Sequence, residues 1–394
     1  MKIAHIWPYF SLRLGSEKQL TKQHELGHEI CLITSDRYLP FSDFSETLGS
    51  IMKERIVGCG SGLVNGLLVY RLPCLLEFDG LILIRGVRKA LSIFRPDIVH
   101  SHGIFSMAPL LPLFYKNSLK FRFFCEPISG EFSIKPMKRV LFEIFKKITM
   151  PYIRKNVDRF FACSREACAW LSKELGIEYN KIAFVPLGAD KDLFRKDIIE
   201  REKIRHYLNI QNDGILIIYA GKILPSKEVD VLLRSAALLM RARKHKTIKI
   251  LLLGNGPRKY IDSLRNLANK YGIAKNLRWH DLVKKEELPS FYSAADIGVW
   301  PGSPSITIIE AMSTTLPIII AKSEWTSHLL EYHNGLSFDR GNPKELAMSL
   351  ERLVENEELR RDMGLRCRRL VEEKLNLNVI AKETVETYKN SLVE

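Results

Sequence analysis

The sequence lacks the features that mark secreted, membrane-spanning and zinc-stabilised proteins. Its seven cysteines are scattered and form no Cys-x-x-Cys pair, so neither a disulfide framework nor a zinc site is expected. No run approaches the roughly 18 apolar residues that a membrane-spanning helix needs. The first residues have strand character and lack the apolar core of a signal peptide. These absences favour a reduced, cytoplasmic protein.

Several common nucleotide and nucleophile motifs are also absent. Gly214 and Gly221 stand too far apart to form a P-loop before Lys222. The pair Gly254 and Gly256 is not followed by the third glycine of a dinucleotide fingerprint. No Gly-x-Ser-x-Gly elbow occurs. The sequence therefore disfavours a kinase, an NAD-dependent dehydrogenase and an α/β-hydrolase.

Acidic residues are few relative to basic ones. The 394 residues include 45 Asp and Glu against 60 Lys and Arg, which gives a formal net charge of +15. Such a charge predicts an anionic partner: nucleic acid, an acidic membrane face or a phosphorylated small molecule. The basic residues are spread along the chain without a recognition motif, so specific nucleic-acid binding is not expected.

Apolar strands alternate with helical segments along the whole chain, which predicts α/β domains with parallel sheets. Residues 1–190 are expected to form one such domain and residues 191–375 a second, followed by a helix over 376–394. The expected strands are 3–7, 29–34, 98–100, 121–125, 159–162, 215–220, 248–253, 277–280, 297–300 and 317–321. Parallel sheets bind ligands beyond the carboxyl ends of their strands, and these ends are therefore where site residues are expected.

Two lysines follow the strand over 215–220. Gly221, Lys222 and Lys227 lie in the loop that leads into a helix. A glycine for close backbone approach, two cations and a helix N-terminus suit a diphosphate. The alternative is that these are ordinary surface lysines of a basic chain.

The strand over 297–300 leads into a helix that carries Glu310 among apolar neighbours. Ser303 or Ser305 is expected to cap this helix. The Glu310 carboxylate could accept two ribose hydroxyl hydrogen bonds, while the first N–H groups of the helix hold a phosphate. The alternative is a solvated glutamate on the helix surface.

The first domain offers Gly15 after its first strand and His102 at the end of the strand over 98–100. Gly15 would let a phosphate approach backbone N–H groups. His100 and His102 lie on the same side of their strand, and His102 is the nearer to the cleft. A structural histidine is the alternative, and metal binding lacks a third ligand nearby in the sequence. Asp190-Lys-Asp192 matches the Asp-x-Asp motif of metal-dependent sugar transferases only formally, and no metal site is expected.

Taken in order, these motifs resemble the large family of retaining glycosyltransferases that includes sucrose synthase and the phosphatidylinositol mannosyltransferases. Each motif is weak alone, but their shared order is specific and covers nearly the whole chain. The resemblance rests on Gly15-Ser-Glu-Lys18, Gly27-His-Glu-Ile30, Asp97 to Gly103, Ala162-Cys-Ser164, Val185 to Asp190, Gly221 to Lys227, Gly254 to Pro257, Glu287 to Asp296, and Glu310-Ala-Met312.

The resemblance implies the GT-B fold, in which two Rossmann-like domains with parallel sheets face each other across a cleft. It implies a retaining, metal-independent hexosyltransferase with no cofactor besides its nucleotide-diphosphate sugar donor. By that resemblance Lys222 and Lys227 hold the diphosphate, Glu310 binds the ribose, and Leu282 and Val283 contact the base. Backbone at Ser305, Ile306 and Thr307 meets the distal phosphate and sugar, Gly15 closes over the phosphates, and His102 lies beside the transferred sugar. The final helix returns to the first domain.

Departures from the family pattern bear on activity. The family's first motif glutamate corresponds to Gly302, and its Glu-Gly-Phe-Gly loop is replaced by residues 302–305. The asparagine usual before Gly188 is Leu187, and the opening glycine pair is Leu14-Gly15. A nucleotide-sugar-binding pseudoenzyme and a GT-B nucleotide-sugar epimerase therefore remain alternatives to the transferase.

The acceptor is expected to be a glycan or a lipid-linked molecule. Basic and apolar residues alternate between 135 and 148, which suits an anionic membrane surface and a peripheral location on the inner face of the cell membrane. The alternative, which the sequence favours for the apolar stripe, is a helix packed on the first domain. The residues concerned are Lys135, Lys138, Arg139, Lys146 and Lys147 with Val140, Leu141, Ile144, Phe145 and Ile148.

Overall fold

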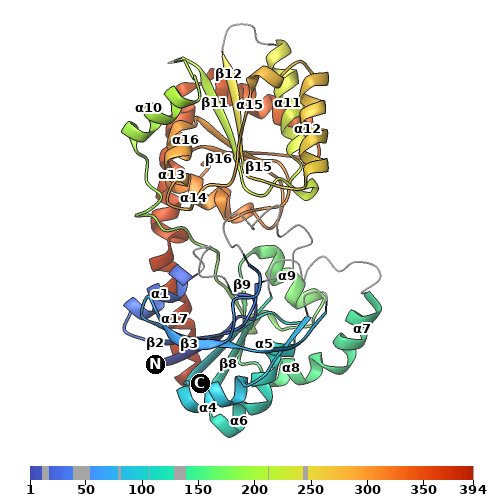
Figure 1. The fold of residues 1–394 in the computed structure, drawn as a ribbon, viewed down its shortest axis with the longest axis vertical. Coiled ribbons are helices and arrows are strands. Elements are labelled where there is room, and N and C mark those ends of the chain that lie inside the picture. Colours follow the sequence, from blue (N-terminus) through green and yellow to red (C-terminus); the bar gives the residue numbers. More distant parts are fainter. Residues whose placement is uncertain are drawn as a thin grey trace. The chain divides into compact units, whose positions relative to one another are not determined.

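The structure is a computed structural model that describes residues 1–10, 17–38, 54–78, 81–105, 107–127, 139–211, 213–242 and 247–393. The described chain folds as two compact units (Figure 1). Unit 1 holds the described residues up to Pro186 together with those from Asn378 onward, and unit 2 runs from Leu187 to Leu377. From the sequence, the corresponding boundaries were expected at residues 190 and 375.

Unit 1 is built on an eight-stranded sheet with the order β10-β9-β8-β7-β1-β2-β4-β3. All its pairings are parallel except that of β3 with β4. A separate antiparallel pair is formed by β5 and β6. The elements are β1 (Lys2–Ile6), α1 (Glu17–Glu25), β2 (Glu29–Ser35), β3 (Gly60–Val64), β4 (Leu67–Leu72), β5 (Cys74–Phe78), β6 (Leu81–Ile84), α4 (Val87–Phe94), β7 (Ile98–His102), α5 (Met107–Leu110), α6 (Lys116–Leu119), β8 (Arg122–Glu126), α7 (Arg139–Ile148), α8 (Met150–Asn156), β9 (Arg159–Ala162), α9 (Arg165–Lys173) and β10 (Ile182–Phe184).

Unit 2 contains a six-stranded, wholly parallel sheet with the order β13-β12-β11-β14-β15-β16. The central strand β11 is buried at every residue, as its unbroken apolar run predicts for a strand covered on both faces. The elements are α10 (Ile198–Tyr207), β11 (Ile215–Ala220), α11 (Val229–Ala242), β12 (Ile248–Leu253), α12 (Arg258–Lys270), β13 (Leu277–His280), α13 (Leu288–Ala294), β14 (Ile297–Trp300), α14 (Thr307–Ser313), β15 (Ile318–Ala321), β16 (Gly335–Phe338), α15 (Pro343–Glu355) and α16 (Glu357–Leu370).

Side-chain caps fix the start of several helices. Ser164 accepts a hydrogen bond from the Ala167 backbone N–H at 3.0 Å and starts α9. Asn342 and Asn356 act in the same way at the starts of α15 and α16. Each cap satisfies a backbone N–H that has no partner within its own helix.

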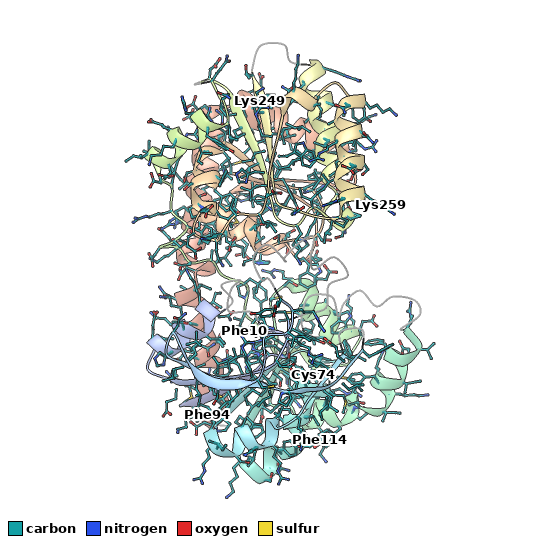
Figure 2. All side chains as sticks on the ribbon, in the orientation of Figure 1. Phe10, Cys74, Phe94, Phe114, Lys249 and Lys259 are labelled. Carbon is teal, nitrogen blue, oxygen red and sulfur yellow. The ribbon has the colours of Figure 1, made fainter. Side chains whose placement is uncertain are left out.

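The last helix, α17 (Leu377–Val393), packs on the sheet of unit 1 (Figure 1). Its Tyr388 side chain is fully buried against Ile3, Phe124 and Phe161. The same core contains Phe10, one of the side chains labelled in Figure 2. The final segment of the chain, which follows unit 2 in the sequence, therefore belongs to unit 1.

Candidate functional site

The loops that follow β11 and β12 pack tightly at the carboxyl edge of the unit 2 sheet. An ideal Cβ on Gly254 would lie 1.8 Å from the carbonyl oxygen of Gly221. One on Gly256 would lie 1.9 Å from the carbonyl oxygen of Ile223. Since neither position has room for a side chain, this glycine pair serves close backbone contact between the two loops.

Lys227 links the loop after β11 to the loop after β14. Its ammonium group donates hydrogen bonds to the carbonyl oxygens of Ser303, at 3.0 Å, and Pro304, at 2.7 Å. Burial lowers the pKa of Lys227 to about 8, and the positive charges of Lys222 and Arg340 act in the same direction. Within the described ranges, no carboxylate forms an ion pair with Lys227. A partly dehydrated cation without an anionic partner is suited to binding an anion.

Gly302 occupies the position where the family has its first motif glutamate, and the structure gives a physical reason for the glycine. An ideal Cβ on Gly302 would lie 2.5 Å from both the Ser226 carbonyl oxygen and the Lys227 carbonyl carbon. Ser303 stabilises the same contact, because its backbone N–H donates a hydrogen bond to the Ser226 carbonyl oxygen at 2.9 Å. Backbone therefore fills the space where a side chain would begin.

The hydroxyl groups of Ser305 and Thr307 lie beside the end of β11. Thr307 Oγ1 donates to the Ala220 carbonyl oxygen at 2.8 Å and lies 2.9 Å from Ser305 Oγ. The buried Trp300 indole N–H donates to the same Ala220 carbonyl oxygen at 3.0 Å. An ideal Cβ on Gly221 would be 3.8 Å from each hydroxyl oxygen. The predicted residues of the β11 and β14 loops are thus brought together.

The predicted cap of α14 was wrong. The helix starts at Thr307, its N-cap is Ile306, and no side chain caps it. The Ser305 hydroxyl lies one residue too early and only reaches the Thr307 backbone N–H at 3.5 Å. Ser303 instead bonds back to the β11 loop.

Glu310 is buried, with 3% of its surface exposed, so the alternative of a solvated helical glutamate is excluded. Its carboxylate forms an ion pair with Lys285 Nζ at 3.0 Å. Lys285 belongs to the loop after β13 that also contains the partly buried Leu282 and Val283. This ion pair joins the loop after β13 to α14, so these predicted residues also lie at one edge of the sheet.

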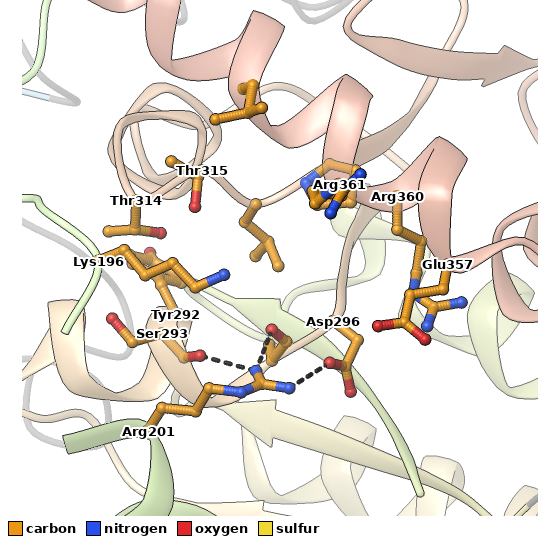
Figure 3. Close-up of a pocket in the computed structure, with 14 residues that line it drawn as sticks. Lys196, Arg201, Tyr292, Ser293, Asp296, Thr314, Thr315, Glu357, Arg360 and Arg361 are labelled. Atoms are coloured by element: carbon orange, nitrogen blue, oxygen red, sulfur yellow. Dashed lines mark hydrogen bonds and ion pairs between the residues drawn. The ribbon is translucent and has the colours of Figure 1, made fainter. Parts of the chain in front are cut away.

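A cavity of about 440 Å³ lies elsewhere in unit 2, at the amino ends of β14 and β15 (Figure 3). Arg201 crosses it and binds Asp296 at 2.6 Å together with the carbonyl oxygens of Ser293, Ala294 and Ala295. These bonds hold the ends of α10, α13 and β14 together. Because ligands of parallel sheets bind at the opposite edge, we treat the cavity as structural.

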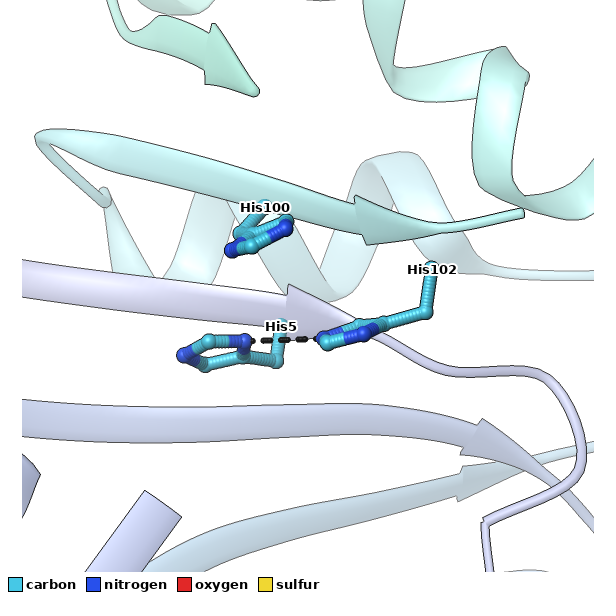
Figure 4. A group of neighbouring side chains, drawn as sticks. All are labelled: His5, His100 and His102. Atoms are coloured by element: carbon cyan, nitrogen blue, oxygen red, sulfur yellow. Dashed lines mark hydrogen bonds between the residues drawn. The ribbon is translucent and has the colours of Figure 1, made fainter. Parts of the chain in front are cut away.

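In unit 1, His5 of β1 lies beside His100 and His102 (Figure 4). The sequence did not predict this third histidine. His5 Nδ1 lies 3.0 Å from His102 Nε2, and His5 Nε2 lies 3.0 Å from Gln23 Oε1. His102 Nδ1 is hydrogen-bonded to the Glu126 carboxylate. All three imidazoles are buried, and burial is the main cause that lowers the pKa of each, to about 3 for His5 and His102. They are therefore neutral.

The three histidines are close enough to raise the question of a metal, with ligand atoms within 4.8 Å of one another. The ring planes of His100 and His102, however, are stacked at 10° with centroids 4.7 Å apart. Lone pairs in two nearly parallel planes do not converge on one ion. Both nitrogens of His5 and of His102 are already engaged, so the group is a hydrogen-bonded chain.

His102 itself is closely packed. Its ring stacks on Trp7, with centroids 4.2 Å apart, and on His100 from the other side. Only 4% of its surface is exposed. Gly15, the other site residue predicted in this half of the chain, lies outside the described residues.

Helix α7 combines a packed and an exposed apolar side. Phe142 and Phe145 contact the ring of Phe105, with centroids about 5 Å apart, as the packed alternative predicts. Val140, Ile144 and Ile148 nevertheless remain 68%, 50% and 74% exposed. Lys135 and Lys138 lie outside the described residues. No helix within the described ranges is long and apolar enough to cross a membrane.

Both halves of the chain match glycosyltransferase families. Residues 200–369 match Glycosyl transferases group 1, and residues 19–193 match Glycosyltransferase Family 4. A D-inositol 3-phosphate glycosyltransferase of Corynebacterium efficiens is 27% identical over 226 residues, which are 56% of this chain and 53% of that relative. The protein of that name from Streptomyces avermitilis is 31% identical over 42% of this chain and 37% of its own length. The chain spans about half the length of the first of these relatives, and less of the second.

Solved structures resemble the chain over nearly its whole length. A glycosyltransferase from Rickettsia africae has a TM-score of 0.73 at 15% identity and covers 99% of this chain and 98% of its own. Anabaena HepE in complex with UDP and glucose has a TM-score of 0.72 at 14% identity, covering 99% and 100%. At such identities the likeness concerns the fold, which is the GT-B fold with two Rossmann-like domains. Since both halves match in order and the fold is shared along the chain, the protein belongs to the group 1 glycosyltransferases.

Proposed function

We propose that the protein is a retaining, metal-independent glycosyltransferase that moves a hexose from a nucleotide-diphosphate sugar to a hydroxyl group of a glycan or lipid-linked acceptor. The observation that carries the proposal is Lys227, a partly dehydrated cation beside Lys222 with no carboxylate partner among the described residues. It lies at the carboxyl edge of the unit 2 sheet, where ligands of such sheets bind. A diphosphate is the anion that two neighbouring cations in one loop suit best.

In this proposal the two lysines act on the leaving group. As the bond between the anomeric carbon and the diphosphate oxygen breaks, the bonding electrons and negative charge pass to the diphosphate. Lys222 and Lys227 stabilise this charge more in the transition state than in the ground state. The acceptor oxygen attacks from the same face, and a donor phosphate oxygen takes its proton. This course requires no pair of catalytic carboxylates.

The remaining predicted residues are proposed to bind the donor. Glu310 would accept the ribose hydroxyls in exchange for part of its contact with Lys285. Leu282 and Val283 would contact the base, and the backbone from Ser305 to Thr307 would meet the distal phosphate and sugar. Gly15 is proposed to bind the phosphates and His102 the transferred sugar.

The relatives support the substrate classes. Those named D-inositol 3-phosphate glycosyltransferases use a phosphorylated polyol by their name, and HepE was solved with UDP and UDP-glucose. The proposal is tested by measuring the melting temperature with UDP, GDP, ADP and their sugar conjugates. A ligand that binds the native state raises the melting temperature of the protein. We expect one base to respond in the wild type and the response to be lost in Lys222→Ala and Lys227→Ala. A panel without any response contradicts the proposal.

Two alternatives are separated by product analysis. The glycine at position 302 favours a pseudoenzyme, which would bind the donor without turning it over. An epimerase would convert the donor sugar without forming a new glycoside. Nuclear magnetic resonance of the reaction mixture, with D-inositol 3-phosphate as the first acceptor tested, distinguishes a glycoside from both outcomes.

A peripheral membrane location is proposed from α7. Its exposed Val140, Ile144 and Ile148 are one turn apart, and Arg139, Lys146 and Lys147 flank them. An apolar stripe beside basic residues suits an anionic bilayer surface. We expect the protein to sediment with vesicles containing phosphatidylglycerol, and less so after replacement of the three apolar residues by serine. Equal sedimentation with purely zwitterionic vesicles contradicts this location.

A further inference from the structure

The buried histidine chain of unit 1 ends at one partly exposed group, Glu126. This residue is the last of β8, at the edge of the sheet where ligands bind. Its side chain is 29% exposed, against 5% for that of His102. Both ring nitrogens of His102 are engaged and both its faces are covered. Glu126 is therefore the member of the chain that a ligand can reach.

The hydrogen-bond partners along the chain assign its protons. With the Gln23 amide oriented as in the structure, its Oε1 faces His5 Nε2 at 3.0 Å and accepts a hydrogen bond from it, so His5 Nε2 carries the hydrogen, while the buried Gln23 Nε2 has no partner among the described residues. A neutral His5 then has a bare Nδ1, which must accept a hydrogen bond from His102 Nε2–H across the 3.0 Å between them. His102, neutral in turn, has a bare Nδ1 facing Glu126, so the hydrogen in that bond belongs to the carboxyl group.

The surroundings of Glu126 agree with a protonated carboxyl group. The groups that act on it are His100 and His102 of β7, Tyr388 of α17 and Cys163 after β9. Burial raises the pKa of the Glu126 carboxyl, while the nearby His100 acts in the opposite direction. His100 bonds to the Tyr388 hydroxyl through Nδ1, and its Nε2 lies 3.8 Å from Glu126 with no hydrogen-bond partner. Among the described residues, no cation therefore offsets a negative charge on Glu126.

We propose that Glu126 binds a hydroxyl group of the sugar or acceptor as an uncharged carboxylic acid, and that Gln23, His5 and His102 are positioning residues that keep its proton in place. This inference rests on the proposed function for the identity of the ligand. One Glu126 oxygen is bound to His102, and the other remains to accept a hydrogen bond from a hydroxyl group.

The protonation state is tested without any substrate. Carbon-13 resonances of glutamate carboxyl groups are followed against pH, and Glu126→Gln identifies the resonance of Glu126. We expect this carboxyl to stay protonated at pH values above the pKa of an ordinary glutamate, which is near 4.3. Nitrogen-15 spectra should show His5 and His102 with hydrogen on Nε2. An ionised Glu126 with hydrogen on Nδ1 of His102 overturns the inference.

Gln23→Met tests the origin of this state, because it removes the acceptor at the far end of the chain while keeping the side-chain length. We expect the Glu126 titration to move toward the ordinary range and the two histidines to change tautomer. Glu178→Gln, at an exposed glutamate of the same unit, is the matched control. An unchanged titration in Gln23→Met would show that burial alone sets the proton.

The ligand contact is tested with UDP-glucose and D-inositol 3-phosphate as probes. We expect the Glu126 resonance to shift when the two are present together. For the transfer reaction, we expect Glu126→Ala to raise the KM of one of these two ligands about two- to tenfold, and Glu126→Gln, whose amide also donates and accepts, to raise it less. An unshifted resonance, or KM values for both ligands that are equal in all three proteins, overturns the contact. Failure of any nucleotide sugar to bind refutes the proposed function, but it leaves the titration of Glu126 as an independent result.

Discussion

Gly302 and Lys227 are in direct backbone contact, with space for no side chain between them. An ideal Cβ on Gly302 would lie 2.5 Å from the carbonyl carbon and 2.7 Å from the Cα of Lys227. The absence of the family's glutamate at position 302 and the position of Lys227 therefore have the same cause, which is the close approach of two loops. The loop after β11 comes so close to the loop after β14 that the Lys227 ammonium group reaches the carbonyl oxygens of Ser303 and Pro304.

Restoring the family's glutamate should therefore weaken nucleotide binding. Gly302→Ala and Gly302→Glu both force backbone apart, and overpacking of this kind typically costs about 1–3 kcal/mol. We expect a lower melting temperature of unit 2 and weaker stabilisation by the responding nucleotide. Gly62→Ala is the control, since a Cβ there meets nothing within 4 Å. Tighter donor binding by Gly302→Glu would contradict this prediction, because it would show that the loop after β14 can accommodate the glutamate side chain.

The affinity for a diphosphate should fall as the pH rises through the pKa of Lys227. Burial lowers this pKa to about 8, so the ammonium form is lost in the alkaline range. Between about pH 7 and pH 9 the charged fraction drops roughly tenfold for such a pKa. Isothermal titration with the responding nucleoside diphosphate measures the change.

Lys227→Arg supplies the control for this pH dependence, because a guanidinium group stays charged over the whole range. We expect weaker binding in this variant at neutral pH, since the longer side chain must reach the same two carbonyl oxygens. Its affinity should nevertheless vary little with pH. If Lys227→Arg and the wild type lose affinity equally at alkaline pH, a group other than Lys227 causes the pH dependence.

The alternation of strands and helices predicted much of the fold. All ten expected strands are present, because central parallel strands are buried on both faces and read as short apolar runs. The hairpin of β3 and β4 was missed although Asn65-Gly66 is a strong turn signal, and both residues have positive φ. The strand β3 is largely exposed and lacks the apolar run from which a strand would be predicted.

The candidate site was predictable where a residue lies between the end of a strand and the first turn of the next helix. Lys222, Lys227, Ser305 and Thr307 lie in such segments, and the parallel sheet brings these segments to one edge. The contact of Gly302 depends on the distance between two loops, which no spacing in the sequence encodes. His5 was detectable as a single polar residue in an apolar strand, but its pairing with β7 lies 95 residues away.

Glu310 is expected to distinguish nucleotides from inorganic pyrophosphate. If its carboxylate accepts ribose hydroxyls, Glu310→Gln should weaken binding of the responding nucleoside diphosphate and leave binding of pyrophosphate unchanged. The loss of charge-assisted bonds predicts a change of about tenfold or more. Lys285→Met, which removes the partner of Glu310, is the matched control. Equal loss for both ligands would place Glu310 in the support of the loop rather than at the ribose.

The bond between Tyr388 and His100 should stabilise unit 1 specifically. Tyr388→Phe leaves His100 without any hydrogen bond on either ring nitrogen, because Nε2 has no partner in the described structure. An unsatisfied buried polar group costs about 1–3 kcal/mol, which corresponds to about 5- to 150-fold faster hydrogen exchange through global opening of the unit. We expect this acceleration for the protected amides of β7 and no change for those of β11. Thr387→Ala, at the neighbouring and only partly buried position on α17, is the control. Unchanged exchange in β7 would mean that water or a rearranged ring replaces the bond, whereas equal acceleration in β11 would mean that the two units unfold together.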